Sequence, residues 1–148
     1  MRAVIQRVAS AAVTVDGRTR GEIGKGYLVL LGIEDIDESS DMEYICDKIL
    51  GLRVFEDEEE KMNLDICDVG GEVLLVSQFT LYGDARKGRR PSFIKAARPE
   101  TAIPLYEAAI ERLSKRLNVA TGEFGAHMQV SLVNDGPVTI LLDSKKTF

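Results

Sequence analysis

The feature that most constrains the fold is a continuous apolar run at residues 27–33, Tyr-Leu-Val-Leu-Leu-Gly-Ile, with glycines before it and acidic residues after it. A strand with one solvated face alternates apolar and polar side chains, whereas an unbroken apolar run is typical of a strand buried on both faces. The run therefore predicts a central strand. A second apolar run at residues 73–79 predicts another strand of the interior.

Shorter β-branched or alternating stretches predict the remaining strands. A turn at Asp16-Gly17 follows the first two of them, and a turn at residues 134–137 joins the last two. These stretches are residues 2–8, 12–15, 52–55, 127–133 and 138–142.

Two segments have the apolar spacing of helices. Residues 40–43, Ser-Asp-Met-Glu, have the form of a capping box, and the apolar repeat that follows ends at Gly51. This predicts a helix at about residues 40–50. A second helix is predicted at about residues 102–117, with Pro104 in its first turn, where proline is tolerated.

A chain of 148 residues is expected to form a single domain, residues 1–148. The predicted class is α/β, with mixed, mostly antiparallel β-sheets in a layered β/β/α arrangement. Two helices cannot cover both faces of such a sheet, so we expect a second sheet layer or a subunit interface to complete the burial. A chain of this size buries roughly 68–70% of its unfolded surface, so Cys46 and Cys67 are expected to be reduced core thiols.

The chain has one histidine, His127, and two distant cysteines, which leaves little scope for metal chemistry. It has no Cys-x-x-Cys and no His-x-x-x-His pair, so we expect neither a zinc site nor any other metal or cofactor. The N-terminus is charged within a few residues, and no apolar run approaches the ~20 residues of a membrane helix. We therefore expect a cytoplasmic protein without a membrane partner.

The charge is unevenly distributed. The formal net charge is −5, which by itself argues against a nucleic-acid partner because phosphate binding depends on Lys and Arg. Residues 84–98 nevertheless carry six basic side chains and one acidic one, a local charge of +5, so the rest of the chain sums to −10. This basic loop is either a solvated surface or a phosphate contact, and its first four cations are Arg86, Lys87, Arg89 and Arg90.

Ser77, Gln78, Phe79 and Thr80 stand at the end of a predicted central strand, where ligand sites often lie in α/β folds. Small hydroxyl side chains at such positions commonly satisfy nearby backbone groups. A nucleophilic hydroxyl requires a base, and His127 is the only histidine that could serve as one. The residues alone leave both interpretations open.

Four segments together carry a resemblance to a known family. They are residues 1–8 (MRAVIQRV), 77–84 (SQFTLYGD), 121–128 (TGEFGAHM) and 134–139 (NDGPVT). The chain resembles the D-aminoacyl-tRNA deacylases from its first residue to its last, and residues 1–148 are thereby identified as a single domain of that kind.

The resemblance implies hydrolysis of the ester between a D-amino acid and the 3′-terminal ribose of tRNA, and also of glycyl-tRNA. It implies a homodimer in which the Gly136-Pro137 dipeptide, with its peptide bond cis, enters the other subunit's active site and excludes L-amino acids. Arg7 then holds this dipeptide. Phe124 and Met128 then line the adenosine and aminoacyl pocket.

The resemblance also implies that Ser77, Gln78, Phe79 and Thr80 carry catalysis. Backbone N–H groups near the last three of them form an oxyanion hole, and the ribose 2′-hydroxyl of the tRNA helps to activate water. Thr80 as a nucleophile is the competing mechanism. The basic loop then contacts tRNA phosphates, which is an inference from charge.

Two other functions remain open from the sequence. One is a tRNA-binding dimer module without enzymatic activity, which keeps Ser77 and Thr80 for structure only. The other is a hydrolase of small esters with a serine or threonine nucleophile and His127 as its base.

Overall fold

A computed structural model describes residues 1–148. The chain forms eight strands, two α-helices and one 3-10 turn. In order these are β1 (Arg2–Val15), β2 (Arg18–Ile23), β3 (Gly26–Gly32), α1 (Ser39–Gly51), β4 (Phe55–Glu56), β5 (Met62–Leu64), β6 (Glu72–Ser77), η1 (Phe79–Tyr82), α2 (Pro99–Ser114), β7 (Val119–Thr121) and β8 (Gln129–Asp143).

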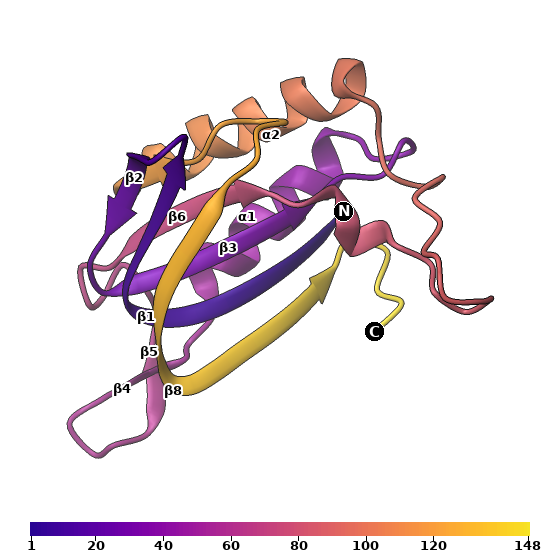
Figure 1. Cartoon of the computed structure of the whole chain (residues 1–148). Helices are drawn as coiled ribbons and strands as arrows, with labels where there is room; N and C mark the ends of the chain where they lie inside the picture. Colours follow the sequence, from indigo (N-terminus) through magenta and orange to yellow (C-terminus); the bar gives the residue numbers. More distant parts are fainter.

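The main sheet has the order β2-β1-β3-β6-β7, and β8 pairs with β1 alone. The pairs of β1 with β2, β3 and β8 are antiparallel, whereas β3–β6 and β6–β7 are parallel. Strands β4 and β5 form a small separate hairpin. Both helices lie on the same side of the sheet (Figure 1). The predicted α/β class with mixed, mostly antiparallel sheets is confirmed.

Strand β3 is buried on both faces, as its apolar run predicts. Tyr27, Val29 and Leu31 belong to the larger core, in which the sheet packs against both helices. Leu28 lies on the opposite face, in a smaller core that it shares with Leu74 of β6. Because successive strand residues point to opposite faces, one apolar run supplies both cores.

The second face of β3 and β6 is covered by the sheet itself. The later half of β1 and strand β2 contribute Val13 and Ile23 to the smaller core, so the sheet curls over into a nearly closed barrel. Arg20 of β2 comes within 3.9 Å of Glu123, just after β7 at the other edge of the sheet. The expected second sheet layer is therefore provided by one curled sheet.

Helix α1 begins close to the predicted position but with a different cap. Glu38 is the N-cap residue; its side chain accepts from the Asp41 backbone, and the Asp41 carboxylate accepts from the Glu38 amide at 2.8 Å. The predicted box at residues 40–43 is wrong by two residues. Carboxylates at the same spacing perform the same capping, and Lys145 fixes Asp41 further through a 2.8 Å hydrogen bond.

Helix α2 begins and ends three residues before the predicted bounds. Pro99 takes the first helical position after the N-cap Arg98, so Pro104 lies inside the helix instead of in its first turn. Proline at position 104 leaves the Glu100 carbonyl without its helical donor, and both residues are exposed, so water can replace the bond. Neither helix is long and apolar enough to cross a membrane.

In two places, a pair of strands predicted as separate forms a single continuous strand. Residues 2–8 and 12–15 both belong to β1. Residues 129–133 and 138–142 both belong to β8, whose two halves pair with β1, so the strand predicted at 127–133 begins two residues too early. The chain does not reverse at residues 134–137. Val8 pairs with Asn134 and Gln6 with Thr139, so the expected turn is a wide bulge in a continuous strand.

Candidate functional site

A cavity of about 270 Å³ lies where β3 and β6 end and the 3-10 turn begins. It brings together five of the residues predicted for the site: Ser77, Gln78, Phe79, Phe124 and Met128. Its other lining residues are Leu31, Ile33, Val76, Ala97, Ala102, Gly125, Ala126, His127 and Val130.

Strand β6 stops at Ser77 because the chain then turns. The Gln78 amide donates to the Leu31 carbonyl at 2.8 Å, and the Leu81 amide donates to the Gln78 carbonyl at 3.2 Å. The strand predicted for residues 73–79 is therefore two residues too long, since Phe79 belongs to the turn.

This hydrogen bonding decides which backbone donors are free at the cavity. The Gln78 amide is occupied by Leu31. Phe79 and Thr80 open the 3-10 turn, where N–H groups have no carbonyl partner within the turn. The three donors considered from the sequence are thus reduced to two, the amides of Phe79 and Thr80.

The hydroxyl of Thr80 accepts a hydrogen bond from Nε2 of Gln78. A carboxamide has no basic site at neutral pH, so this neighbour cannot activate the hydroxyl as a nucleophile. His127 lines the cavity, but no hydrogen bond joins it to Ser77 or Thr80. The side-chain triad considered from the sequence is not assembled in this structure.

Phe124 and Met128 are half-buried and serve both the cavity and the core. The Phe124 ring lies 5.9 Å from the Tyr106 ring, and the Tyr106 hydroxyl donates to the Leu75 carbonyl at 2.8 Å. Burial raises the pKa of Tyr106 to about 12, so the phenol remains a neutral donor. The wall formed by Phe124 is thereby tied to a β6 residue close to Ser77.

Arg7 is 4% exposed and connects the β8 bulge to the β4–β5 hairpin. Its Nε donates to the Asp135 carbonyl at 3.2 Å, and its Nη1 donates to the Val54 carbonyl at 2.6 Å and to Glu56 at 2.9 Å. Gly136 has φ +123°, and a Cβ there would lie 3.1 Å from Nη2 of Arg7. Only glycine fits this position, and the Gly136-Pro137 peptide bond is cis.

The bulge and the cavity lie far apart within one chain. Arg7 pairs with Tyr27, and Ser77 pairs with Leu31, so the two groups differ by four residues along the strands, about 13 Å. They also lie three strand spacings apart across β8, β1, β3 and β6, about 14 Å. Measured along the surface of the sheet, the two groups are roughly 19 Å apart. Neither Gly136 nor Pro137 lines the cavity of its own chain.

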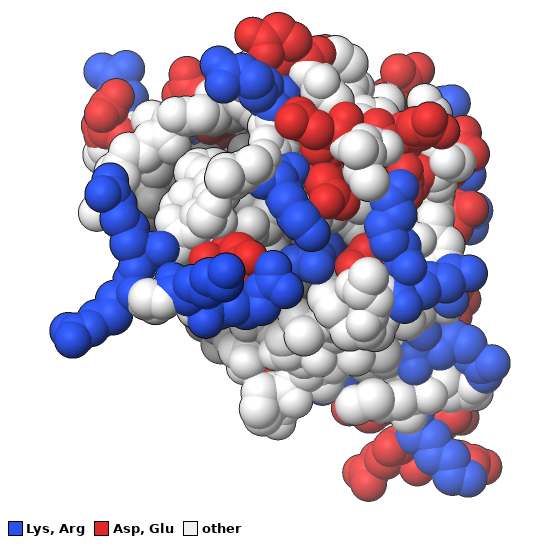
Figure 2. Space-filling model, turned by 90° about the vertical axis from the view of Figure 1, so that its right-hand side faces the viewer, with Lys and Arg blue, Asp and Glu red and all other residues white.

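The basic loop projects beside the cavity and is fixed at its base. Backbone hydrogen bonds of 2.8 and 2.9 Å join Asp84 to Ser92. Arg86 donates to the Asp84 carboxylate at 2.6 Å, which holds the pKa of that carboxyl well below its usual range. Lys87, Arg89 and Arg90 are exposed. Lys and Arg side chains form a band across this face of the molecule (Figure 2), and none of the loop's four predicted cations lines the cavity.

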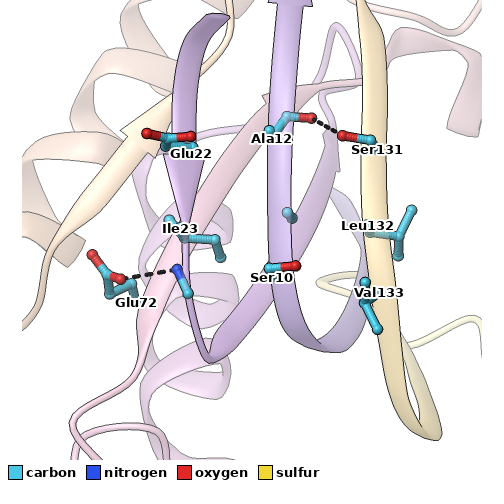
Figure 3. Close-up of a pocket in the computed structure, with 10 residues that line it drawn as sticks. Ser10, Ala12, Glu22, Ile23, Glu72, Ser131, Leu132 and Val133 are labelled. Carbon is cyan, nitrogen blue, oxygen red and sulfur yellow. Dashed lines mark hydrogen bonds between the residues drawn. The ribbon is translucent and has the colours of Figure 1, made fainter.

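A second, wider hollow of about 550 Å³ lies over β1, β2 and β8 (Figure 3). The Glu72 carboxylate accepts from the Gly24 amide at 3.1 Å at its edge, and Leu132 and Val133 form part of its apolar wall. It contains no histidine or cysteine. No cluster of three or more His, Cys, Asp or Glu side chains is placed to hold a metal ion.

No sequence pattern marks Ala97 and Ala102 as cavity residues. They reach the cavity because the chain folds back after the basic loop, and the Ala97 amide donates to the Ile33 carbonyl at 2.9 Å. Small side chains of this kind have no local pattern that distinguishes a cavity wall from a helix interface.

Comparison with known proteins gives a consistent result. Residues 4–143 match the family model described as D-Tyr-tRNA(Tyr) deacylase. The chain is 63% identical to the D-aminoacyl-tRNA deacylase of Clostridioides difficile over 149 aligned positions, covering 100% of both chains. It is 60% identical to the D-aminoacyl-tRNA deacylase of Symbiobacterium thermophilum, covering 100% of this chain and 99% of that one.

Two solved structures share the fold. A c-Myc DNA unwinding element binding protein superposes with a TM-score of 0.91 at 46% identity, over 97% of this chain and 98% of that one. A probable eukaryotic D-amino acid tRNA deacylase superposes with a TM-score of 0.80 at 17% identity, over 95% and 97% of the two chains. The second likeness concerns the fold alone.

Proposed function

This chain belongs to the D-Tyr-tRNA(Tyr) deacylase family, and on that premise we propose that it hydrolyses the ester joining a D-amino acid to the 3′-terminal ribose of tRNA. The observation that carries the proposal is the cavity at Ser77 and Gln78, lined by the turn whose first amides are free. The products are free tRNA and the D-amino acid. Glycyl-tRNA is a second substrate.

Backbone donors carry the chemistry. The oxygen of a water molecule bonds to the ester carbonyl carbon, and the carbonyl oxygen becomes an oxyanion that the amides of Phe79 and Thr80 stabilise. The intermediate then breaks its bond to the ribose 3′-oxygen, which leaves with a proton. The ribose 2′-hydroxyl orients the water and relays that proton. One well-placed oxyanion donor contributes about 10²- to 10³-fold in rate.

Chirality is tested at the α-carbon by a backbone wall. The carbonyl oxygens of Gly136 and Pro137 hold the amino group of the D-amino acid and leave no space for an L side chain. The D side chain points outward and is not read, so many D-amino acids are accepted. Glycine has no side chain to exclude and passes the same wall.

The wall comes from a second copy of the chain in a homodimer. The separation of roughly 19 Å along the sheet between the bulge and the cavity supports this, because neither Gly136 nor Pro137 lines the cavity of its own chain. Strand β8 pairs only with β1, and its Leu132, Val133 and Leu141 are 38%, 57% and 57% exposed. An apolar, unpaired edge strand of this kind is normally covered by a partner.

The basic loop at residues 84–98 contacts tRNA phosphates. Its position beside the cavity and its local charge of +5 support this role, because neutralised phosphates release counterions. The net charge of −5 for the whole chain limits non-specific binding. A tRNA substrate is consistent with a cytoplasmic enzyme.

Nucleic-acid binding without hydrolysis is the second candidate. The likeness to a c-Myc DNA unwinding element binding protein, at 46% identity, favours it. Under this alternative the basic loop binds nucleic acid while the Ser77 cavity has no catalytic role. Ester cleavage separates the two candidates.

The deciding experiment incubates the purified protein with D-Tyr-tRNA, L-Tyr-tRNA and Gly-tRNA and follows the loss of the ester. We expect cleavage of the D and glycyl esters and sparing of the L ester by at least about a hundredfold. Equal cleavage of the D and L esters would overturn the chiral wall. Binding of all three without cleavage would support the second candidate.

Subunit mixing tests whether the site is shared. Gly136→Val removes the wall, and Phe79→Pro removes an oxyanion donor, so each homodimer is expected to be inactive on D-Tyr-tRNA. A mixed dimer has one intact site, made from one subunit's turn and the other subunit's bulge. Activity that returns on mixing supports the shared site, and a mixture as inactive as its components contradicts it.

A further inference from the structure

Two exposed aromatic rings stand beside the cavity. Phe79 and Phe93 are 57% and 38% exposed, and their centroids lie 5.3 Å apart with the rings inclined at 73°. Ile94 beside them is 88% exposed. An exposed apolar patch within a strongly charged loop is costly to hydrate, and neither ring belongs to the cores under the sheet.

Backbone contacts on both sides of Phe93 fix its position. The bridge between Asp84 and Ser92 precedes it, and the Ala96 amide donates to the Phe93 carbonyl at 3.1 Å in a tight turn. Gly83 lets the ring approach, because a Cβ at that position would lie 2.9 Å from Cε1 of Phe93. The ring is therefore held edge-on to Phe79 on an anchored segment.

The chemistry around this pair favours a nucleic acid over another protein. The rings stand within residues 79–98, together with the cations of the basic loop. Aromatic faces next to Lys and Arg are the common platform for single-stranded nucleic acid, because every base has a π-face and every linkage carries a phosphate. A protein interface of the same area would have fewer exposed cations.

We propose that Phe93, supported by Phe79, stacks on the base of the nucleotide that precedes the esterified terminal nucleotide. The inference rests on the proposed function: when the terminal ester occupies the cavity that Phe79 lines, the preceding nucleotide lies at the rim, where Phe93 stands. Stacking does not read base identity. The platform thus strengthens binding of any unpaired 3′ end, while the cavity and wall select the amino acid.

The test uses three D-tyrosyl esters: of adenosine, of the dinucleotide CA and of the trinucleotide CCA. For the unmodified protein we expect kcat/KM to rise about tenfold from adenosine to CA. Phe93→Ala is expected to lose that rise while cleaving the adenosine ester at the unmodified rate. Phe93→Leu, which keeps apolar bulk without a π-face, is expected to behave like Phe93→Ala, and Phe93→Tyr is expected to restore the rise.

Met62→Ala is the control, since Met62 is an exposed apolar side chain, 54% accessible, on β5; it should leave the series unchanged. An equal loss on all three esters, or no loss on any, would overturn the platform. A change in oligomeric state of Phe93→Ala by light scattering would instead identify the ring as a subunit contact and also overturn it. If the unmodified protein cleaves none of the three esters, the proposed function itself has failed.

Discussion

Arg7 donates from Nε to the carbonyl oxygen of Asp135 at 3.2 Å, and this bond ties the centre of β1 to the bulge of β8. The other arm of the same guanidinium donates to the Val54 carbonyl at 2.6 Å. One rigid, planar group thus spans two segments that are far apart in the sequence. The orientation of Gly136 next to Asp135 depends on that geometry.

Arg7→Lys is expected to loosen the bulge while keeping the charge, because a lysine ammonium cannot reproduce the fork of a guanidinium. We expect the ratio of kcat/KM for D-Tyr-tRNA over L-Tyr-tRNA to fall about tenfold, and the free energy of unfolding in urea to fall by about 1–3 kcal/mol. Arg53→Lys is the control, since Arg53 is exposed and donates to the Asn63 carbonyl within the hairpin. An unchanged ratio in Arg7→Lys would remove Arg7 from chiral selection.

The sequence predicts the fold well where burial is intrinsic to one segment. Residues 27–33 are apolar throughout, and the structure buries Tyr27 and Leu28 on opposite faces of β3. Prediction from sequence fails where the pairing of a segment with a distant segment decides its structure. Residues 134–137 have the composition of a turn, yet they form a bulge because both halves of β8 find the long strand β1 as their neighbour.

The candidate site likewise has one part that the sequence predicts and one part that depends on the tertiary structure. The polar cluster at Ser77 is visible at the end of an apolar run, and Phe124 and Met128 line the same cavity as Ser77. That these two side chains contact the adenosine and the aminoacyl group stays a prediction. The Gln78 amide cannot serve as an oxyanion donor because it donates to the Leu31 carbonyl, and this bond depends on the parallel pairing of β3 with β6. No local pattern reports that pairing, so the choice between three backbone donors required the tertiary structure.

Neutralising the basic loop should weaken tRNA binding in a salt-dependent manner. Arg89→Ser with Arg90→Ser is expected to raise KM for D-Tyr-tRNA several-fold at 0.1 M salt, and to reduce the slope of log affinity against log salt by about 1–2. Titrations at several salt concentrations measure both. Lys115→Ser with Arg116→Ser removes the same charge beyond the far end of α2. If both pairs of substitutions have the same effect, the loop makes no local phosphate contact.

Acid should destabilise the fold partly through Asp41. Burial alone would raise its pKa, but hydrogen bonds from the Lys145 side chain and the Glu38 backbone lower the pKa to about 2. A carboxylate whose folded pKa lies below its unfolded value of 3.8 adds stability above pH 4, and that stability is lost as the pH falls from about 4 to 2. Asp41→Asn should cost up to about 2 kcal/mol at pH 7 and flatten this part of the profile in urea unfolding.

The control for that profile is Glu107→Gln, an exposed carboxylate on α2, which should leave both the stability and its pH dependence unchanged. An Asp41→Asn protein that loses stability between pH 4 and 2 as steeply as the parent would show that other carboxylates carry the acid transition.

Side-chain nucleophiles should be dispensable. Thr80→Val keeps the backbone amide and the side-chain shape but removes the hydroxyl that accepts from Gln78. We expect it to retain kcat within about tenfold, and His127→Ala to retain kcat within about threefold, because general-base catalysis by either would contribute ~10²–10⁴. Single-turnover cleavage of D-Tyr-tRNA measures both. Near-complete loss with unchanged binding in either variant would restore a side-chain mechanism.

The backbone mechanism can be tested by removing one N–H group. Phe79 is the first residue of the 3-10 turn, where proline is tolerated because its missing N–H makes no bond within the turn. Phe79→Pro and Phe79→Ala both lose the ring, so their ratio isolates the amide. We expect kcat on the D-tyrosyl ester of adenosine to be about 10²- to 10³-fold lower for Phe79→Pro than for Phe79→Ala. The two variants are expected to have equal thermal unfolding midpoints. Equal turnover of the two variants would exclude the Phe79 amide as an oxyanion donor and leave the Thr80 amide to act alone.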